Sequence, residues 1–272
     1  MKVLITNTID YYYVKFTFMR RFVPVIIVLM LLGLSSCVDI EERYTFRADG
    51  SCRVVYGFDM SRAVSVLKNL MTDSVQATPE FSITKDTSLN FYSAIPDSIQ
   101  RNMSAEDVQL AKTSDLSVKM DLRKSLMKVN VSHVAKNAAD LEYYLKNISK
   151  ISMNSQLSAI AKNPTKKGDI DSQSLMAGQD YYTYEITPTR FRRIVDKVKF
   201  NAFLKKTQST LIMAKAMLID MPYKVVLNFA KPVKKVNNSK AVLSADRKSV
   251  TLITDMDEII KNPAIMNLQV DF

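Results

Sequence analysis

Glycine, cysteine and histidine are scarce in this sequence. Five glycines in 272 residues leave no glycine-rich loop of the kind that cradles nucleotide phosphates. Two cysteines and one histidine are too few for a zinc site, and the cysteines offer no disulfide framework. We therefore expect no cofactor and no metal.

The sequence also lacks an apolar run long enough to cross a bilayer as a helix. The longest run, Phe22 to Leu34, is shorter than the roughly 20 apolar residues that a membrane-spanning helix needs. Arg20 and Arg21 precede it, and Ser35-Ser36-Cys37 follow it, which is the order of parts in a secretory signal. We predict a signal peptide over residues 1–36 and a mature chain over 37–272. Met19 is the expected start, because the segment before it does not fit a signal.

The end of the apolar run, Leu34-Ser35-Ser36-Cys37, resembles the lipobox of bacterial lipoproteins. This resemblance implies that Cys37 becomes the first mature residue and carries the acyl chains, palmitate among them. Two or three chains hold a protein firmly on a bilayer, where one chain does not. The implied location is the outer membrane, on its periplasmic face or at the cell surface. The alternative is an ordinary cleaved signal with a chance cysteine.

Charge favours anionic partners over nucleic acid. The chain has a net charge of +11 at pH 7, but an exported protein does not meet nucleic acid, so we exclude that partner. The basic residues concentrate in two segments, where we predict contact with lipid phosphates or acidic glycans. The alternative is an ordinary solvated surface. The candidate residues are Arg190, Arg193, Lys197, Lys234 and Lys235.

Alternating apolar residues predict a strand from Val38 to Ala48 and a second strand from Cys52 to Met60. Asp49-Gly50 between them predicts a type I′ hairpin turn, and a helix is expected to follow through Leu70. The same order, hairpin and then helix, recurs over residues 116–148. We interpret the segments 38–71 and 116–148 as two copies of an internal repeat.

The other segments complete an α+β fold. Residues 72–90 and 149–179 are polar and are predicted to be loops, and the C-terminal part spans 181–272. In that part we expect a strand over 182–186, one long helix over 189–219, a strand over 223–229, a hairpin over 241–254, a short helix from Asp255 and a final strand over 268–272. The fold class is α+β, with a largely antiparallel sheet of about eight strands built from hairpin–helix units. We also expect an apolar cavity between the long helix and the sheet.

No catalytic constellation is evident. His133 is the single histidine, and any Ser–His or Cys–His nucleophile pair would have to use it. We interpret His133 as a hydrogen-bonded histidine at a strand end and Cys52 as a buried thiol. No catalytic residue is assigned, and the expected protein is not an enzyme.

Two triplets, Asp73-Ser74-Val75 and Asp97-Ser98-Ile99, resemble the O-glycosylation acceptor of Bacteroides-type bacteria. The resemblance implies sugar attachment at Ser74 and Ser98. Both serines lie in or near the predicted loops, where a sugar fits.

The mature N-terminus, Cys37-Val38-Asp39-Ile40-Glu41-Glu42 onward to Asp59-Met60-Ser61, resembles uncharacterised lipoproteins of Bacteroides-type bacteria. The segment from Pro232 through Asn237-Asn238 to Val250 is loosely similar to an LppM-like lipoprotein family with a lipid-binding α+β domain. Neither family supplies catalytic residues. We expect a membrane-anchored envelope lipoprotein that binds a lipid, a glycan or an envelope protein. The alternatives are a scaffold or assembly subunit of an envelope complex and, less favoured, a hydrolase.

Overall fold

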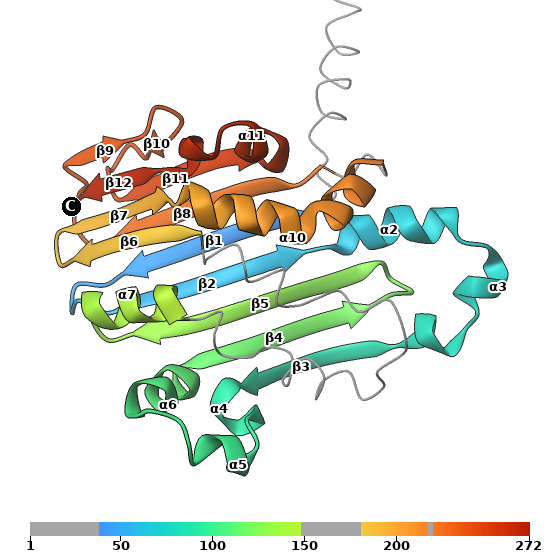
Figure 1. The fold of residues 1–272 in the computed structure, drawn as a ribbon. Coiled ribbons are helices and arrows are strands. Elements are labelled where there is room, and N and C mark those ends of the chain that lie inside the picture. The colour runs from blue at the N-terminus through green and yellow to red at the C-terminus, as the bar shows by residue number, and fades with distance from the viewer. Residues whose placement is uncertain (1–37, 148–180, 217–219) are drawn as a thin grey trace, which may run out of the picture. The chain divides into compact units, whose positions relative to one another are not determined.

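The computed structural model describes residues 38–147, 181–216 and 220–272 (Figure 1). Cys37–Phe272 form one compact unit. The predicted signal peptide, the start at Met19, the acylation of Cys37 and the predicted loop over 149–179 lie outside the described residues. The α+β class with mostly antiparallel strands is confirmed.

The larger sheet, here called sheet A, contains eight strands, and only the pair β1–β8 is parallel. The alternate residues of each central strand are buried on one face, as the period of two requires. In spatial order the strands are β10 (Val242–Leu243), β11 (Ser249–Asp255), β8 (Pro222–Phe229), β1 (Asp39–Phe46), β2 (Cys52–Asp59), β5 (Leu126–Ala135), β4 (Ser114–Asp121) and β3 (Thr84–Asn90).

A second sheet, here called sheet B, contains four antiparallel strands: β6 (Tyr182–Thr187), β7 (Arg190–Val195), β12 (Leu268–Asp271) and β9 (Lys235–Asn237). It packs on the buried face of sheet A through aromatic rings. The ring centroids of Phe191 and Tyr44 lie 5.2 Å apart, and those of Phe272 and Phe229 lie 4.4 Å apart. Burial of such rings stabilises the interface between the sheets.

Helices lie over the same face of sheet A and around its margins (Figure 1). Leu141, Tyr144 and Leu145 form the buried stripe of α7, which packs on β5 and beside β6. The helical segments are α2 (Ser61–Leu70), α3 (Asp73–Gln76), η1 (Pro79–Ser82), α4 (Phe91–Ala94), α5 (Asp97–Gln100), α6 (Ala105–Lys112), α7 (Ala138–Asn147), α10 (Lys197–Ala216), α11 (Met256–Lys261) and η4 (Pro263–Met266).

Both predicted hairpin–helix units are present, as β1–β2–α2 and β4–β5–α7. The turn type in the first unit differs from the prediction. Gly50 adopts a positive φ of 85°, but Asp49 does not, so the turn is not type I′. Instead, Arg47 N donates to Ser51 O at 2.8 Å, and the Asp49 carboxylate accepts from Ser51 N at 2.9 Å. This five-residue loop needs a left-handed backbone only at the glycine.

Two predicted segments need correction. The helix expected over 189–219 begins at Lys197, because Arg190–Val195 forms strand β7 between β6 and β12. The residues predicted as a loop over 72–90 contain helix α3, the turn η1 and strand β3, which pairs with β4 at the edge of sheet A. Strand β3 was missed because its sequence, TKDTSLN, is almost entirely polar.

Candidate functional site

The two faces of sheet B differ sharply in chemistry. Strand β7 alternates, so Arg193 points into the interior while Arg192 points outward. The Arg193 side chain is 0% exposed and the Arg192 side chain is 44% exposed. Each face is therefore a separate candidate site.

On the inner face, Arg193 forms an ion pair with Glu42 of β1, and both side chains are fully buried. Arg193 Nη1 donates to Glu42 Oε2 at 2.7 Å. The Tyr44 hydroxyl donates to Glu42 Oε2 at 2.9 Å, and the Tyr223 hydroxyl donates to Glu42 Oε1. The carboxylate is thus held by three donors, which offset the large cost of burying a charge.

The remainder of the Arg193 guanidinium lies over the ring of Tyr182, with Cζ 4.4 Å from the ring centroid. Within the described residues, Nε and Nη2 of Arg193 have no hydrogen-bond acceptor, so this cation–π contact is their main compensation. Burial is the largest single influence on the pKa of Arg193 and lowers it, but the charge of Glu42 and the surrounding tyrosines together raise it more, so that the net shift is upward. Burial, followed by the charge of Glu42, raises the pKa of Tyr223 well above its ordinary value. Both upward shifts keep the Arg193 guanidinium charged and the Tyr223 hydroxyl protonated at neutral pH.

His133, the single histidine, is also buried, on β5. Its Nδ1 lies 2.9 Å from Ser114 Oγ, and its ring stacks on Tyr144 with centroids 4.0 Å apart. Burial lowers the pKa of His133 to about 4. The Ser114 hydroxyl donates to the carbonyl of Leu110 at 2.7 Å, so this proton is already committed to the backbone. Both side chains are 0% exposed, and a substrate therefore does not reach this Ser–His pair.

Cys52 is 1% exposed, and burial raises its pKa to about 12. The predicted buried thiol is confirmed. A thiol held protonated in this way is neither a nucleophile nor a metal ligand.

On the outer face of sheet B, side chains from β7, β9 and β12 form the floor of an open groove of about 430 Å³. The turn after β9 and the segment around η4 form its walls. Five of the twelve lining residues carry side-chain amides, which both donate and accept hydrogen bonds. The lining consists of Arg192, Ile194, Asn237, Asn238, Ser239, Lys240, Asn262, Ala264, Ile265, Asn267, Leu268 and Gln269.

Two of these asparagines build the groove. Asn238 Nδ2 donates to the carbonyls of Ile265 and Asn267 at 2.8 and 2.7 Å, and so ties the turn to η4. Asn267 Oδ1 accepts from the backbone N–H of Val195 at 2.8 Å, which ties the same wall to β7. The groove thus has a fixed framework made of polar side chains.

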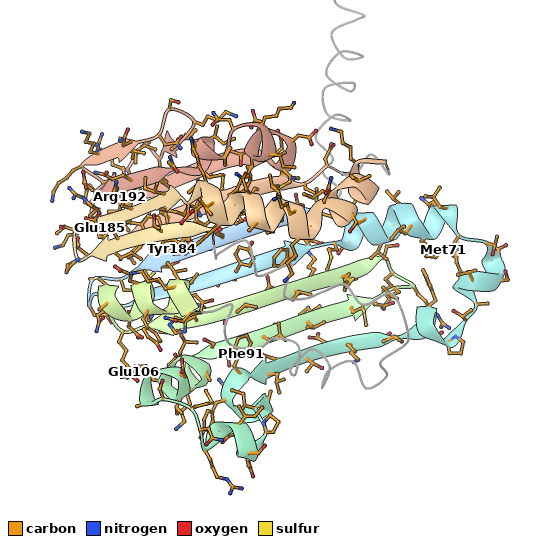
Figure 2. All side chains as sticks on the ribbon, in the orientation of Figure 1. Met71, Phe91, Glu106, Tyr184, Glu185 and Arg192 are labelled. Carbon is orange, nitrogen blue, oxygen red and sulfur yellow. The ribbon has the colours of Figure 1, made fainter. Side chains whose placement is uncertain are left out.

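Other polar groups in the groove remain available to a ligand. Asn237 and Asn262 are exposed, and within the part of the chain that is described their side-chain amides make no hydrogen bond. Arg192 and Lys240 are the only charged residues in the lining, and each is paired outside it. Arg192 Nη1 lies 3.0 Å from Glu185 Oε2, and Figure 2 shows these two labelled side chains at the outer side of sheet B. Lys240 pairs with Glu258. No carboxylate lines the groove itself, and the carboxylates of Glu185 and Glu258 that pair with its two cations lie outside the lining.

The predicted basic residues divide between three places. Arg190, Lys234 and Lys235 gather around Asp271, where Arg190 Nε donates to Asp271 Oδ1 at 2.7 Å and Lys235 lies opposite Asp271 in the sheet register. Lys197 is exposed at the start of α10, away from this group. The prediction for Arg193 is wrong, because its side chain is buried against Glu42 and contacts no surface ligand.

Sequence reasoning did not assign Asn262, Asn267 or Gln269 to a site. The available signals were the alternation Leu268-Gln269-Val270, which points Gln269 outward, and the polar turn Asn237-Asn238-Ser239. Neither signal shows that β9 and β12 are neighbours.

Ser74 on α3 and Ser98 on α5 are both exposed. Exposure is a requirement for sugar attachment, so both remain predictions. Among the described residues there is no cluster of three or more side chains suited to bind a metal ion. Within the same residues, no helix combines the length and the apolar character needed to cross a membrane.

Comparison with protein-family models, with curated proteins and with solved structures found no match for this chain.

Proposed function

We propose that this chain is a non-enzymatic, membrane-anchored lipoprotein of the cell envelope that binds an acidic glycan in the groove of sheet B. The observation that carries the proposal is the lining of the groove, with its amides, two cations and no carboxylate. Amides and hydroxyls match the paired donors and acceptors of a sugar, and the cations match its acid groups.

The composition of the groove favours a glycan over a lipid. A pocket for acyl chains is lined mainly by apolar side chains, whereas Ile194, Ala264, Ile265 and Leu268 are the only apolar members here. The cluster of Arg190, Lys234 and Lys235 continues the same outward face beyond the groove. It supplies further positive charge for a longer acidic chain.

The position of this basic cluster also argues against contact with the anchoring leaflet. Phe272, beside the cluster, packs on Phe46 at the end of β1, whereas the predicted anchor precedes the start of β1. Eight residues at about 3.3 Å each separate the two ends by about 26 Å. This is several times the Debye length of about 8 Å at physiological ionic strength. The cluster is therefore positioned for a ligand in the aqueous phase.

A calorimetric titration tests the proposal. The detergent-solubilised protein is titrated with a galacturonic acid tetramer as the acidic probe and with maltotetraose as the neutral probe. We expect binding of the acidic tetramer, weakened about threefold by Asn237→Ala and unchanged by Asn201→Ala, a matched exposed asparagine on α10. Equal binding of the two probes, or equal effects of the two variants, would refute the groove as the site.

Two alternatives are less well supported. A scaffold subunit needs a continuous exposed apolar patch, and most exposed apolar side chains are spread over separate elements, such as Ile99 on α5, Val134 on β5 and Ile253 on β11. A hydrolase needs an accessible nucleophile, and the Ser114–His133 pair is fully buried.

A further inference from the structure

One end of sheet A carries exposed apolar side chains that the groove does not explain. Leu70 at the end of α2 is 71% exposed, Val75 on α3 is 44% exposed, and Ile83 before β3 is 40% exposed. These three residues belong to one stretch of chain, residues 61–83, here called the corner segment. Exposed aliphatic side chains that recur within one short segment often indicate a surface that contacts an apolar partner.

The strand register shows where the corner segment lies. It connects the end of β2 to the start of β3, and Asp59 near its beginning pairs with Asp39 at the start of β1. The start of β3 pairs with the end of β4, at the same end of the sheet. Figure 1 shows α2 and α3 beyond the strand ends on the side where β1 begins. The labelled Met71 in Figure 2 marks the turn between these two helices.

The corner segment is held in place by hydrogen bonds. Lys68 Nζ donates to the carbonyl of Arg123 at 2.6 Å, in the turn between β4 and β5. Arg123 Nη2 donates to Ser82 Oγ at 2.5 Å. Gln76 Nε2 donates to the carbonyls of Lys68 and Met71 at 2.9 and 3.2 Å. The exposed side chains are therefore presented by a fixed framework.

The chain outside the structure joins the domain at this same end. Residues 1–37 precede Val38, whose backbone N–H donates to the carbonyl of Asp220 at 3.0 Å, and β1 begins at the next residue. No linker separates Cys37 from the folded domain. If Cys37 carries acyl chains, the end of sheet A with the corner segment lies within a few residues of the bilayer.

We propose that the corner segment is a membrane-contact surface, in which Leu70, Val75 and Ile83 enter the interfacial region of the lipid bilayer. The inference rests on the proposed anchoring at Cys37 and adds a second, non-covalent contact to it. Apolar side chains that enter the headgroup and acyl boundary reach a depth of about 5–10 Å. The contact fixes the long axis of β1 relative to the membrane and directs the far end of the domain away from it.

The absence of tryptophan from the sequence gives a clean test. Val75→Trp and Val134→Trp replace two valines of similar exposure, 44% and 39%, at opposite ends of sheet A. Leu70→Trp is a second probe in the corner segment, in case Val75→Trp disturbs the short helix α3. Each acylated full-length variant is reconstituted into vesicles whose lipids carry brominated acyl chains, which quench tryptophan on contact.

We expect the fluorescence of Trp at positions 70 and 75 to fall by half or more, and that of Trp at position 134 to stay unchanged. If all three tryptophans stay unquenched while the acylated protein floats with the vesicles, the anchoring stands and the membrane contact is refuted. Equal quenching at the two ends would mean unspecific adsorption and would also refute it. A protein that carries no acyl chain would refute the proposed anchoring, and this inference with it.

Mass spectrometry of proteolytic peptides gives an independent check at the same place. A sugar on Ser74 would hold the neighbouring Val75 out of the bilayer, so the two predictions for α3 exclude each other. We expect any added sugar mass to map to Ser98, and a sugar found on Ser74 would overturn the membrane contact.

Discussion

Arg192 and Arg193 are neighbours in one strand, yet their environments are opposite. Arg193 is sealed between two sheets, bonded to Glu42 and stacked on Tyr182. Arg192 faces solvent, lines the groove and forms an ion pair with Glu185, with Nη1 3.0 Å from Oε2. The comparison teaches that strand alternation places two adjacent arginines in opposite environments, one in the interior and one in solvent.

The largest expected effect on stability comes from replacing Arg193, the buried arginine. Arg193→Leu leaves the Glu42 carboxylate buried without its cation, which we expect to destabilise the domain by about 3–5 kcal/mol. Urea unfolding followed by circular dichroism measures the loss. The double variant Glu42→Met with Arg193→Leu removes both charges and should recover most of the stability. A double variant as unstable as the single one would contradict an ion pair as the source of the loss.

A second effect belongs to the interior and depends on pH. Because burial lowers the pKa of His133 from 6.5 to about 4, the unfolded chain binds a proton that the folded chain does not, between these two values. The contribution of neutral His133 to the free energy of unfolding is therefore fully present above pH 6.5. It falls by about 3 kcal/mol as the pH drops toward about 4.

His133→Phe keeps a ring for Tyr144 and removes the proton site. Urea unfolding across this pH range should then show a shallower decline than the parent protein. An identical decline in both proteins would show that a group other than His133 causes the loss of stability.

The third effect lies in the walls of the groove. Asn238→Ala removes two donors to the carbonyls of Ile265 and Asn267, and we expect a loss of about 1–3 kcal/mol in unfolding free energy. Binding of the acidic tetramer should weaken as well, because the turn after β9 is no longer hydrogen-bonded to the segment around η4. Asn201→Ala serves as the control, and equal stability of the two variants would show that the tie contributes little.

The smallest effect on stability is expected for the outer arginine. Arg192→Ala breaks only an exposed ion pair, which is typically worth about 0–1 kcal/mol, so thermal unfolding should barely change. Binding of the acidic tetramer should weaken about tenfold, since a charged hydrogen bond is lost. Lys197→Ala on α10 is the matched control. A large loss of stability in Arg192→Ala would contradict the claim that only Arg193 of the two arginines stabilises the fold.

Much of the fold could be predicted from residue alternation. Val54 and Tyr56, or Val129 and Val131, show the period of two because one face of sheet A is buried and the other is not. Strand β3 was not predicted because an edge strand has little apolar surface to bury, and its residues are mostly charged and polar. Strand β7 was predicted as helix because the spacing of Phe191 and Val195 fits a helix as well as a strand.

The candidate site was harder to foresee. Alternation assigns Arg192 and Gln269 to an exposed face, but it does not show that residues nearly 80 positions apart meet across β7 and β12. Arg193 was predicted to contact an anion, and it does, but the anion is Glu42 in the interior. A single sequence carries no signal for this partner, because the pair depends on how the two sheets stack.

The most direct test of the central claim is to locate the acidic tetramer on the protein by nuclear magnetic resonance. In spectra of the ¹⁵N-labelled protein, we predict that the side-chain signals of Arg192, Asn237 and Gln269 shift with added tetramer while that of Arg193 does not. Unchanged signals on the outer face, or shifts confined to other parts of the domain, would contradict the proposed groove.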